Sequence, residues 1–269
     1  MLFRSDHQGN FSKPLRLSGR AVVAPFTADM LLTGAVANLP QLQSQPSSHS
    51  LVLVPSDRAL LGLERQPQLH TPFARSFRAF IESVDAQFDV CVIDTNPNPD
   101  IRLIAALASA DFVLSPIQLN QEAMDGVNAL LNHDRVGVRK IKTVLNPKLQ
   151  LMGLLPTLVE SNPFQKANFQ HVVQRYGPLM ILVGSLPGQY AFLPRRSIIA
   201  EAQANAEVLW RVKKTAARDA WKEIEPGMAH IAGLLMPRPE NANATTADST
   251  PATTPDTSTE IGGSHATAT

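Results

Sequence analysis

An aspartate at the end of a short apolar segment is the residue best placed for chemistry in this sequence. Residues 88–94 read Phe-Asp-Val-Cys-Val-Ile-Asp, and Thr95 follows Asp94. Such a run is typical of a strand buried on both faces of a parallel sheet. Because ligands bind outside the carboxyl ends of these strands, Asp94 is expected where a nucleotide-bound metal could be held. The alternative is an acid that caps the next helix.

Strands and helices that alternate along the chain must position Asp94. Short apolar runs predict strands, and apolar positions at helical spacing predict the helices between them. The alternation predicts an α/β fold, with a doubly wound, mostly parallel sheet and helices on both faces. The expected strands are residues 51–54, 88–94, 111–116, 152–159 and 180–186, and the expected helices are residues 57–66, 72–87, 101–109, 121–133, 163–176, 197–207 and 212–234.

Composition divides the chain into a domain and a tail. The 269 residues are 44% hydrophobic, enough for one sizeable core, which we assign to residues 1–236. Residues 237–269 are mostly Ala, Thr, Ser, Pro, Asn and Asp and are expected to be disordered. The single cysteine, Cys91, excludes a disulfide within one chain and is expected to be a small buried apolar residue. No long uncharged apolar run predicts a membrane span, so we expect a cytoplasmic protein.

Three segments, in this order, resemble the motifs of ParA-type partition ATPases. Residues 6–12 resemble the D-x-Q-G-N-x-[ST] segment, residues 88–95 the Walker B strand, and residues 110–118 the strand that follows it. The resemblance covers roughly residues 1 to 230. It implies a fold like that of P-loop NTPases.

The resemblance also implies a nucleotide site with ATP and Mg²⁺. Asp6 matches the family position near the attacking water and the metal, and Asp94 matches the acid that holds Mg²⁺ through a water. Thr95 would add a hydroxyl behind that metal. For Asp6 the other interpretation is a simple Asx turn before Gly9.

The phosphate side of that site has no counterpart in residues 1–269. The sequence contains no G-x-x-x-x-G-K-[ST] motif, whose backbone amides and lysine would hold the phosphates. Asn96 and Asn98 also interrupt the usual Pro-Pro after Asp-Thr. We therefore expect a fold incomplete at the N-terminus, in a truncated or divergent chain that does not hydrolyse ATP alone.

A basic region late in the chain is the candidate DNA-binding surface. The resemblance implies non-specific DNA binding there, a homodimer, a ParB-like centromere-binding partner and a nucleoid-associated location. The alternative is a solvated helix face, because acids such as Glu201 and Glu223 are interleaved with the bases. The candidate residues are Arg195, Arg196, Arg211, Lys213, Lys214 and Arg218.

Two functions stay open. The first is a ParA-like plasmid or chromosome partitioning protein, ancestrally an ATP-switched, DNA-associated dimer. The second is a non-enzymatic remnant or regulatory subunit that binds a partner without nucleotide. A membrane-bound positioning protein of the MinD type is disfavoured, because the acidic, polar tail is no basic amphipathic helix.

Overall fold

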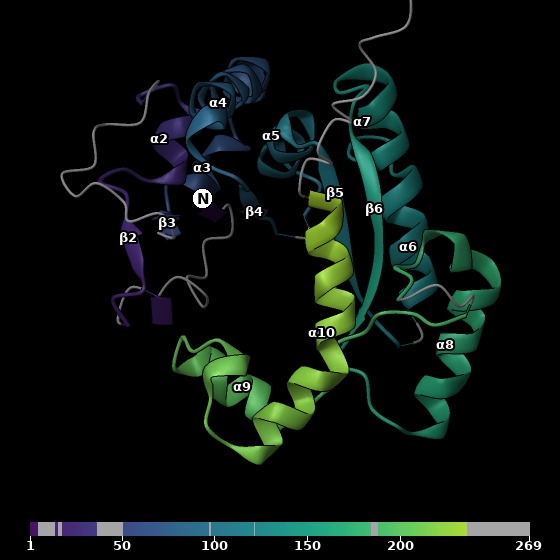
Figure 1. Ribbon diagram of the computed structural model, residues 1–269. Helices are drawn as coiled ribbons and strands as arrows, with labels where there is room; N and C mark the ends of the chain where they lie inside the picture. The colour runs from purple at the N-terminus through teal and green to yellow at the C-terminus, as the bar shows by residue number, and fades with distance from the viewer. Residues whose placement is uncertain are drawn as a thin grey trace, which may run out of the picture. The chain divides into compact units, whose positions relative to one another are not determined.

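Parallel strands form two sheets in this protein (Figure 1). The computed structural model describes residues 1–4, 14–15, 18–36, 51–96, 98–120, 122–183 and 188–235. One sheet has four strands in the order β2-β3-β1-β4, and the other pairs β5 with β6. The strands are β1 (Leu2–Arg4), β2 (Ala21–Val23), β3 (Leu51–Val54), β4 (Val92–Asp94), β5 (Phe112–Gln118) and β6 (Gln150–Thr157).

Helices follow the strands along the chain, which confirms the predicted α/β class. The strands meet in two sheets in the described part of the chain, where the sequence predicted one. The α-helices are α2 (Ala28–Leu32), α3 (Leu60–Leu63), α4 (His70–Val84), α5 (Ile101–Ser109), α6 (Ala123–Asn132), α7 (Val138–Val144), α8 (Pro163–Tyr176), α9 (Ser197–Ala204) and α10 (Thr215–Leu235). Short 3-10 turns are η1 (Pro67–Leu69), η2 (Asp85–Gln87), η3 (Gly177–Leu179) and η4 (Leu209–Arg211).

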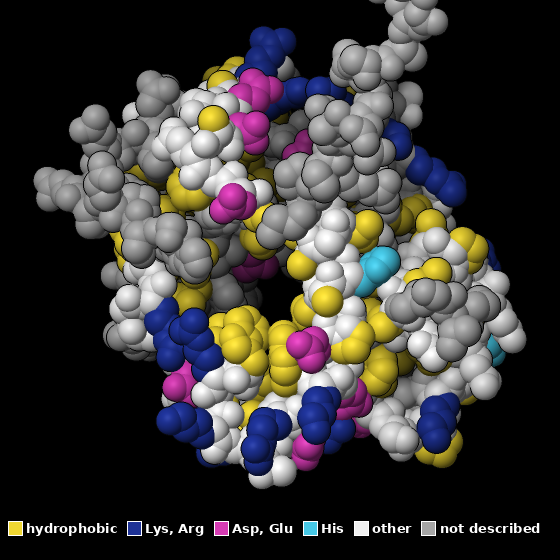
Figure 2. All heavy atoms as spheres, viewed as in Figure 1, with side chains coloured by type: hydrophobic (Ala, Val, Ile, Leu, Met, Phe, Trp, Pro, Cys, Tyr) yellow, Lys and Arg dark blue, Asp and Glu magenta, His cyan; other side chains and the backbone are white. Residues whose placement is uncertain are grey.

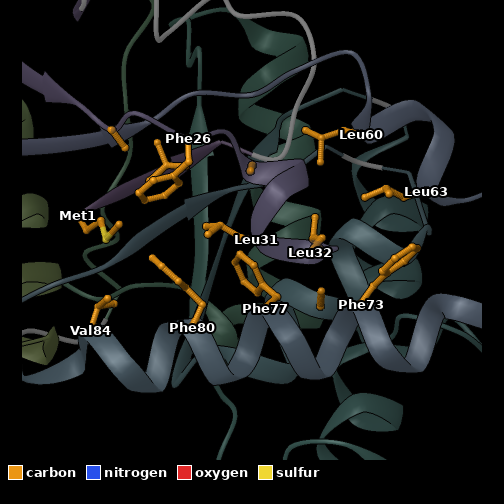
Figure 3. Packing of buried hydrophobic residues seen from close by; sticks show 14 of the residues in the cluster. Met1, Phe26, Leu31, Leu32, Leu60, Leu63, Phe73, Phe77, Phe80 and Val84 are labelled. Atoms are coloured by element: carbon orange, nitrogen blue, oxygen red, sulfur yellow. The ribbon is translucent and has the colours of Figure 1, made fainter. Parts of the chain in front are cut away.

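Helix α4 supplies much of the core of the four-stranded sheet. Its residues Phe73, Phe77, Phe80 and Val84 recur at helical spacing, and all four are buried. Figure 3 shows Phe77 and Phe80 of α4 pointing toward Leu31 of α2, whereas Phe73 lies near Leu63 of α3 and Val84 lies near Met1. The Phe80 ring meets the Phe26 ring edge to face, with 5.8 Å between their centroids.

Helix α5 packs against the cores of both sheets. Ile101 and Ala105 belong to the core of the four-stranded sheet. Leu107, from the same helix, packs with Ile141 of α7 and Leu149 beside the two-stranded sheet. In the described residues β4 pairs only with β1, and β5 pairs only with β6, so each of these strands has one edge without a strand partner.

Several predicted elements differ from the structure. Helix α7 was not among the helices expected from the sequence, although Val138 and Ile141 give it a buried face. The strand expected at residues 180–186 appears only as isolated bridges at Met180 and Leu182 in its described part. The tail, residues 237–269, lies outside the described residues.

Candidate functional site

Asp94 is the last residue of β4 and opens the loop that leads to α5. Its Cα pairs in register with that of Arg4 on the neighbouring strand β1. Asp94 and Thr95 are both partly buried. Within the part of the chain that the structure describes, no three His, Cys, Asp or Glu side chains form a group that could hold a metal. A metal at Asp94 would therefore need other ligands.

Asp100, rather than Asp94, caps helix α5. Its Oδ1 accepts hydrogen bonds from the backbone N–H groups of Arg102, at 2.9 Å, and Leu103, at 3.4 Å. Its Oδ2 accepts from Arg102 Nε at 2.9 Å and also contacts Arg102 Nη2. The interpretation of Asp94 as the cap of the next helix is therefore wrong.

The pair of Asp100 and Arg102 is buried at the base of this loop. Asp100 is 6% exposed and Arg102 is 5% exposed. Burial alone would raise the pKa of Asp100, but the hydrogen bonds and charge of Arg102 outweigh it and hold that pKa below its usual value. A charged carboxylate thus fixes the end of the loop that begins at Asp94.

Asn96 brings an open hydrogen-bond acceptor into the same loop. The residue is buried, and its Nδ2 donates to Asp100 Oδ2 at 3.3 Å. Its Oδ1 has no hydrogen-bond partner among the described residues. A buried acceptor left without a donor costs about 1–3 kcal/mol. The loop after Asp94 therefore holds a buried acceptor that a donor from outside the described residues would satisfy.

Asp6 and Cys91 were also singled out from the sequence. Asp6 lies outside the described residues, so its role stays a prediction. Cys91 is partly buried, and burial raises the pKa of its thiol to about 11. Because the thiolate is the reactive form, a thiol of this kind is a poor nucleophile at neutral pH.

The six candidate DNA-binding residues divide into two groups. Arg195 pairs with Glu160 at 2.9 Å, Arg196 with Glu223 at 2.6 Å, and Lys214 with Glu201 at 2.5 Å. Arg211, Lys213 and Arg218 have no carboxylate partner within the described ranges, and Arg218 Nη2 donates to Thr215 Oγ1 at 3.2 Å.

The basic side chains gather over α9 and the start of α10. Figure 2 shows Lys and Arg at the lower rim of the molecule, with acidic side chains between them. The exposed Trp210 lies beside them and packs on Trp221, with ring centroids 4.8 Å apart. Interleaved acids therefore neutralise part of this surface, and its free cations are concentrated near η4.

A cavity of about 570 Å³ lies beyond the carboxyl ends of β5 and β6. Its apolar lining includes Leu119, Val159, Phe169 and Phe192, and Arg195 lies at its polar side. Pockets for small ligands are of about this size, but charged side chains such as Glu160 and Glu223 also line this one. Sequence reasoning missed the cavity, because its lining residues come from segments far apart in the chain.

None of the described helices is long and apolar enough to cross a membrane.

Comparison with known proteins identifies the family. Residues 2–151, more than half of the chain, match the family model of an AAA domain. Protein IncC of Escherichia coli is 31% identical over 219 residues, 81% of this chain and 56% of that protein. Chromosome partitioning protein ParA of Myxococcus xanthus is 32% identical over 125 residues, 46% of this chain and 41% of that protein. The chain belongs to the ParA-type partition ATPase family.

The fold of this ParA-type chain agrees with that assignment. A McdA variant from Cyanothece, solved in complex with ATP, superposes with a TM-score of 0.64 at 17% identity. The match covers 88% of this chain and 85% of that chain. The chain spans little more than half the length of the Escherichia coli relative.

Proposed function

We propose that this chain is part of a ParA-like partition protein that works as an ATP-switched dimer on DNA. The observation that carries the proposal is Asp94 at the carboxyl end of β4, followed by a loop fixed by the buried pair of Asp100 and Arg102. Such a strand end is where open α/β sheets bind nucleotides. The Asn96 acceptor adds a polar group that the described part of the chain leaves open.

On this proposal, Asp94 holds Mg²⁺ through a water and Thr95 orients that water. Asp6 would lie near the attacking water. Mg²⁺ would neutralise charge on the phosphates, which is most of what phosphoryl transfer requires of a protein. These roles come from the family resemblance.

The phosphate side of the site is proposed to come from outside the described residues. Among the described residues β4 and β5 each have one edge without a strand partner, where one more parallel strand could pair, and α5 packs beside both sheets. The four-stranded sheet already contains a connection that skips one strand, because β3 and β4 follow each other in sequence and β1 lies between them in the order β3-β1-β4. A strand between β4 and β5, leading into a glycine-lysine loop, would join the sheets and complete the site. Residues 1–269 alone would then not hydrolyse ATP.

The basic surface near η4 would hold DNA without sequence preference. Arg211, Lys213 and Arg218 are proposed as the principal phosphate contacts, because their charges are not paired with carboxylates among the described residues. Arg195, Arg196 and Lys214 would contribute less, since DNA must compete with their acidic partners. We further propose that a ParB-like protein regulates the dimer, and that the protein is cytoplasmic and nucleoid-associated.

Purified residues 1–269 test the proposal directly. We expect no Mg²⁺-dependent ATP hydrolysis above that of an Asp94→Ala variant, together with DNA binding that weakens steeply with salt. Turnover at rates of about 1 s⁻¹ or more, within the common range for enzymes, would refute the incomplete site. If the wild-type protein does not bind DNA at low salt, the proposed DNA surface is refuted.

A second function is a regulatory subunit that binds its partner without nucleotide. The absence of a glycine-lysine loop from residues 1–269 favours it. Pull-down of a ParB-like partner with and without ATP separates the two functions. Equal capture supports the regulatory subunit, and ATP-dependent capture supports the switch.

A further inference from the structure

One carboxylate, that of Glu64, joins three segments that are distant in sequence. Glu64 follows the last residue of α3. Its Oε2 accepts a hydrogen bond from the backbone N–H of Ile101 at 2.8 Å. Arg135, in the turn between α6 and α7, donates from Nη1 to Oε1 at 2.7 Å and from Nη2 to Oε2 at 3.4 Å. Glu64 therefore joins the start of α5 to the helices beside the second sheet.

Arg135 also grips the loop that follows β4. Its Nη1 donates to the carbonyl oxygen of Pro99 at 3.2 Å, and its Nη2 lies 3.2 Å from His70 Nδ1. His70 Nε2 lies 3.2 Å from the carbonyl oxygen of Glu64. Because a carbonyl only accepts, Nε2 must carry the hydrogen, and Nδ1 is then free to accept from Arg135.

These contacts exceed those of an ordinary surface ion pair. The Arg135 and Glu64 side chains are 40% and 38% exposed, and such pairs alone contribute only about 0–1 kcal/mol. Here, however, the guanidinium binds both carboxylate oxygens, the carboxylate holds the first amide of α5, and the guanidinium holds Pro99. Hydrogen bonds with one charged partner are about twice as strong as neutral ones. These hydrogen bonds share two side chains, so they act together on the loop.

The loop held in this way is the one that begins at Asp94. Asp100 and Arg102 fix it from inside, and the Glu64–Arg135 pair fixes it from outside. We propose that Glu64, His70 and Arg135 form a latch that sets the position of Pro99 and of the start of α5 and, through them, that of Asp94. Glu64 and Arg135 are positioning residues. The effect of the latch on Mg²⁺ and nucleotide binding rests on the proposed nucleotide site. Its effect on the start of α5 does not depend on that site.

Hydrogen exchange in the full chain measures the latch itself. Glu64→Gln and Arg135→Gln should each speed exchange of the Ile101 amide about tenfold, as loss of a charge-assisted hydrogen bond implies. The double variant should be no faster than the faster single variant, because both changes open one latch. The control pair is Glu82→Gln and Arg78→Gln, which removes an exposed ion pair within α4 and should leave this amide unchanged.

Unchanged exchange at Ile101, or effects that simply add in the double variant, would overturn the latch. If Glu64→Gln fails to fold, Arg135→Lys keeps the charge but loses the two-pronged contact, and it should still speed exchange at Ile101. Retained protection in that variant would also overturn the proposal.

Nucleotide affinity separates a positioning role from general stability. The readout uses a fluorescent ATP analogue and a fusion in which the strand and glycine-lysine loop of a ParA-type ATPase precede Met1. In this fusion, Glu64→Gln should reduce the gain in affinity that Mg²⁺ gives and leave the Mg²⁺-free affinity unchanged. An equal loss with and without Mg²⁺ would overturn the link between the latch and Asp94. If the fusion with unchanged Glu64 binds no analogue, the proposed nucleotide site and this link both fail, while the exchange result still decides the latch.

Discussion

Replacing Asp100 with asparagine should destabilise the protein far more than its small change in shape suggests. Asparagine keeps an oxygen that caps α5, so the cap itself is retained. The change removes the carboxylate that faces the Arg102 guanidinium, and both residues are buried. Removing one partner of a buried ion pair costs about 3–5 kcal/mol. Because asparagine can still accept one hydrogen bond from Arg102, we expect about 3 kcal/mol.

Urea unfolding followed by circular dichroism gives this free energy, and linear extrapolation provides its value in water. For a domain of this size, about 3 kcal/mol corresponds to a fall in Tm of about 6–12 °C. Asp57→Asn is the matched control: Asp57 is exposed, its Oδ1 accepts from Ala59 N at 2.8 Å, and the change should cost less than about 0.5 kcal/mol. A second variant, Asp100→Asn with Arg102→Leu, should recover much of the loss because the buried charge is gone. A cost below about 1 kcal/mol for Asp100→Asn would refute the buried-pair argument.

Three further predictions concern the core, acid stability and DNA. Phe80→Ala should lower the unfolding free energy by about 3–5 kcal/mol in urea titrations, since Phe80 is fully buried, whereas a cost near zero would place it outside the core. The pKa values of Glu64 and Asp100 are lower in the folded protein than in the unfolded chain. The stability that these two carboxylates contribute is therefore present above their unfolded pKa values, near 4, and is lost as pH falls through the lower folded values. Urea titrations from pH 6 to 2 should show this loss of stability, and the loss should be smaller in Asp100→Asn. Lys213→Ala with Arg218→Ala should reduce the salt slope of DNA binding by about 2 in fluorescence anisotropy, more than Arg195→Ala does, and an unchanged slope would remove these residues from the interface.

The local elements were largely predictable from the sequence. Helices α5 and α8 occupy the predicted residues, 101–109 and 163–176, because their apolar spacing and their N-caps, Asp100 and Asn162, are local signals. The short strand β2 was missed, because its three residues carry too little pattern to separate a strand from a loop.

The partners of the site could not be predicted. Asp94 was placed correctly at the end of a strand, but the contacts of the loop after it depend on Glu64 and Arg135, which lie 71 residues apart. Sequence spacing carries no information on such a contact. The ion pairs of the basic region could not be predicted either. The sequence shows where the basic residues lie but not that Arg195 pairs with Glu160, an acid 35 residues away.

The central claim is that Asp94 belongs to the metal side of a nucleotide site whose phosphate side lies outside residues 1–269. The most direct measurement is the ATPase rate of a fusion in which the strand and glycine-lysine loop of a ParA-type ATPase precede Met1. The account predicts Mg²⁺-dependent hydrolysis that is absent from residues 1–269 alone and falls at least about tenfold with Asp94→Ala, but not with Glu82→Gln. Hydrolysis by residues 1–269 alone, or a fusion whose activity ignores Asp94→Ala, would contradict it.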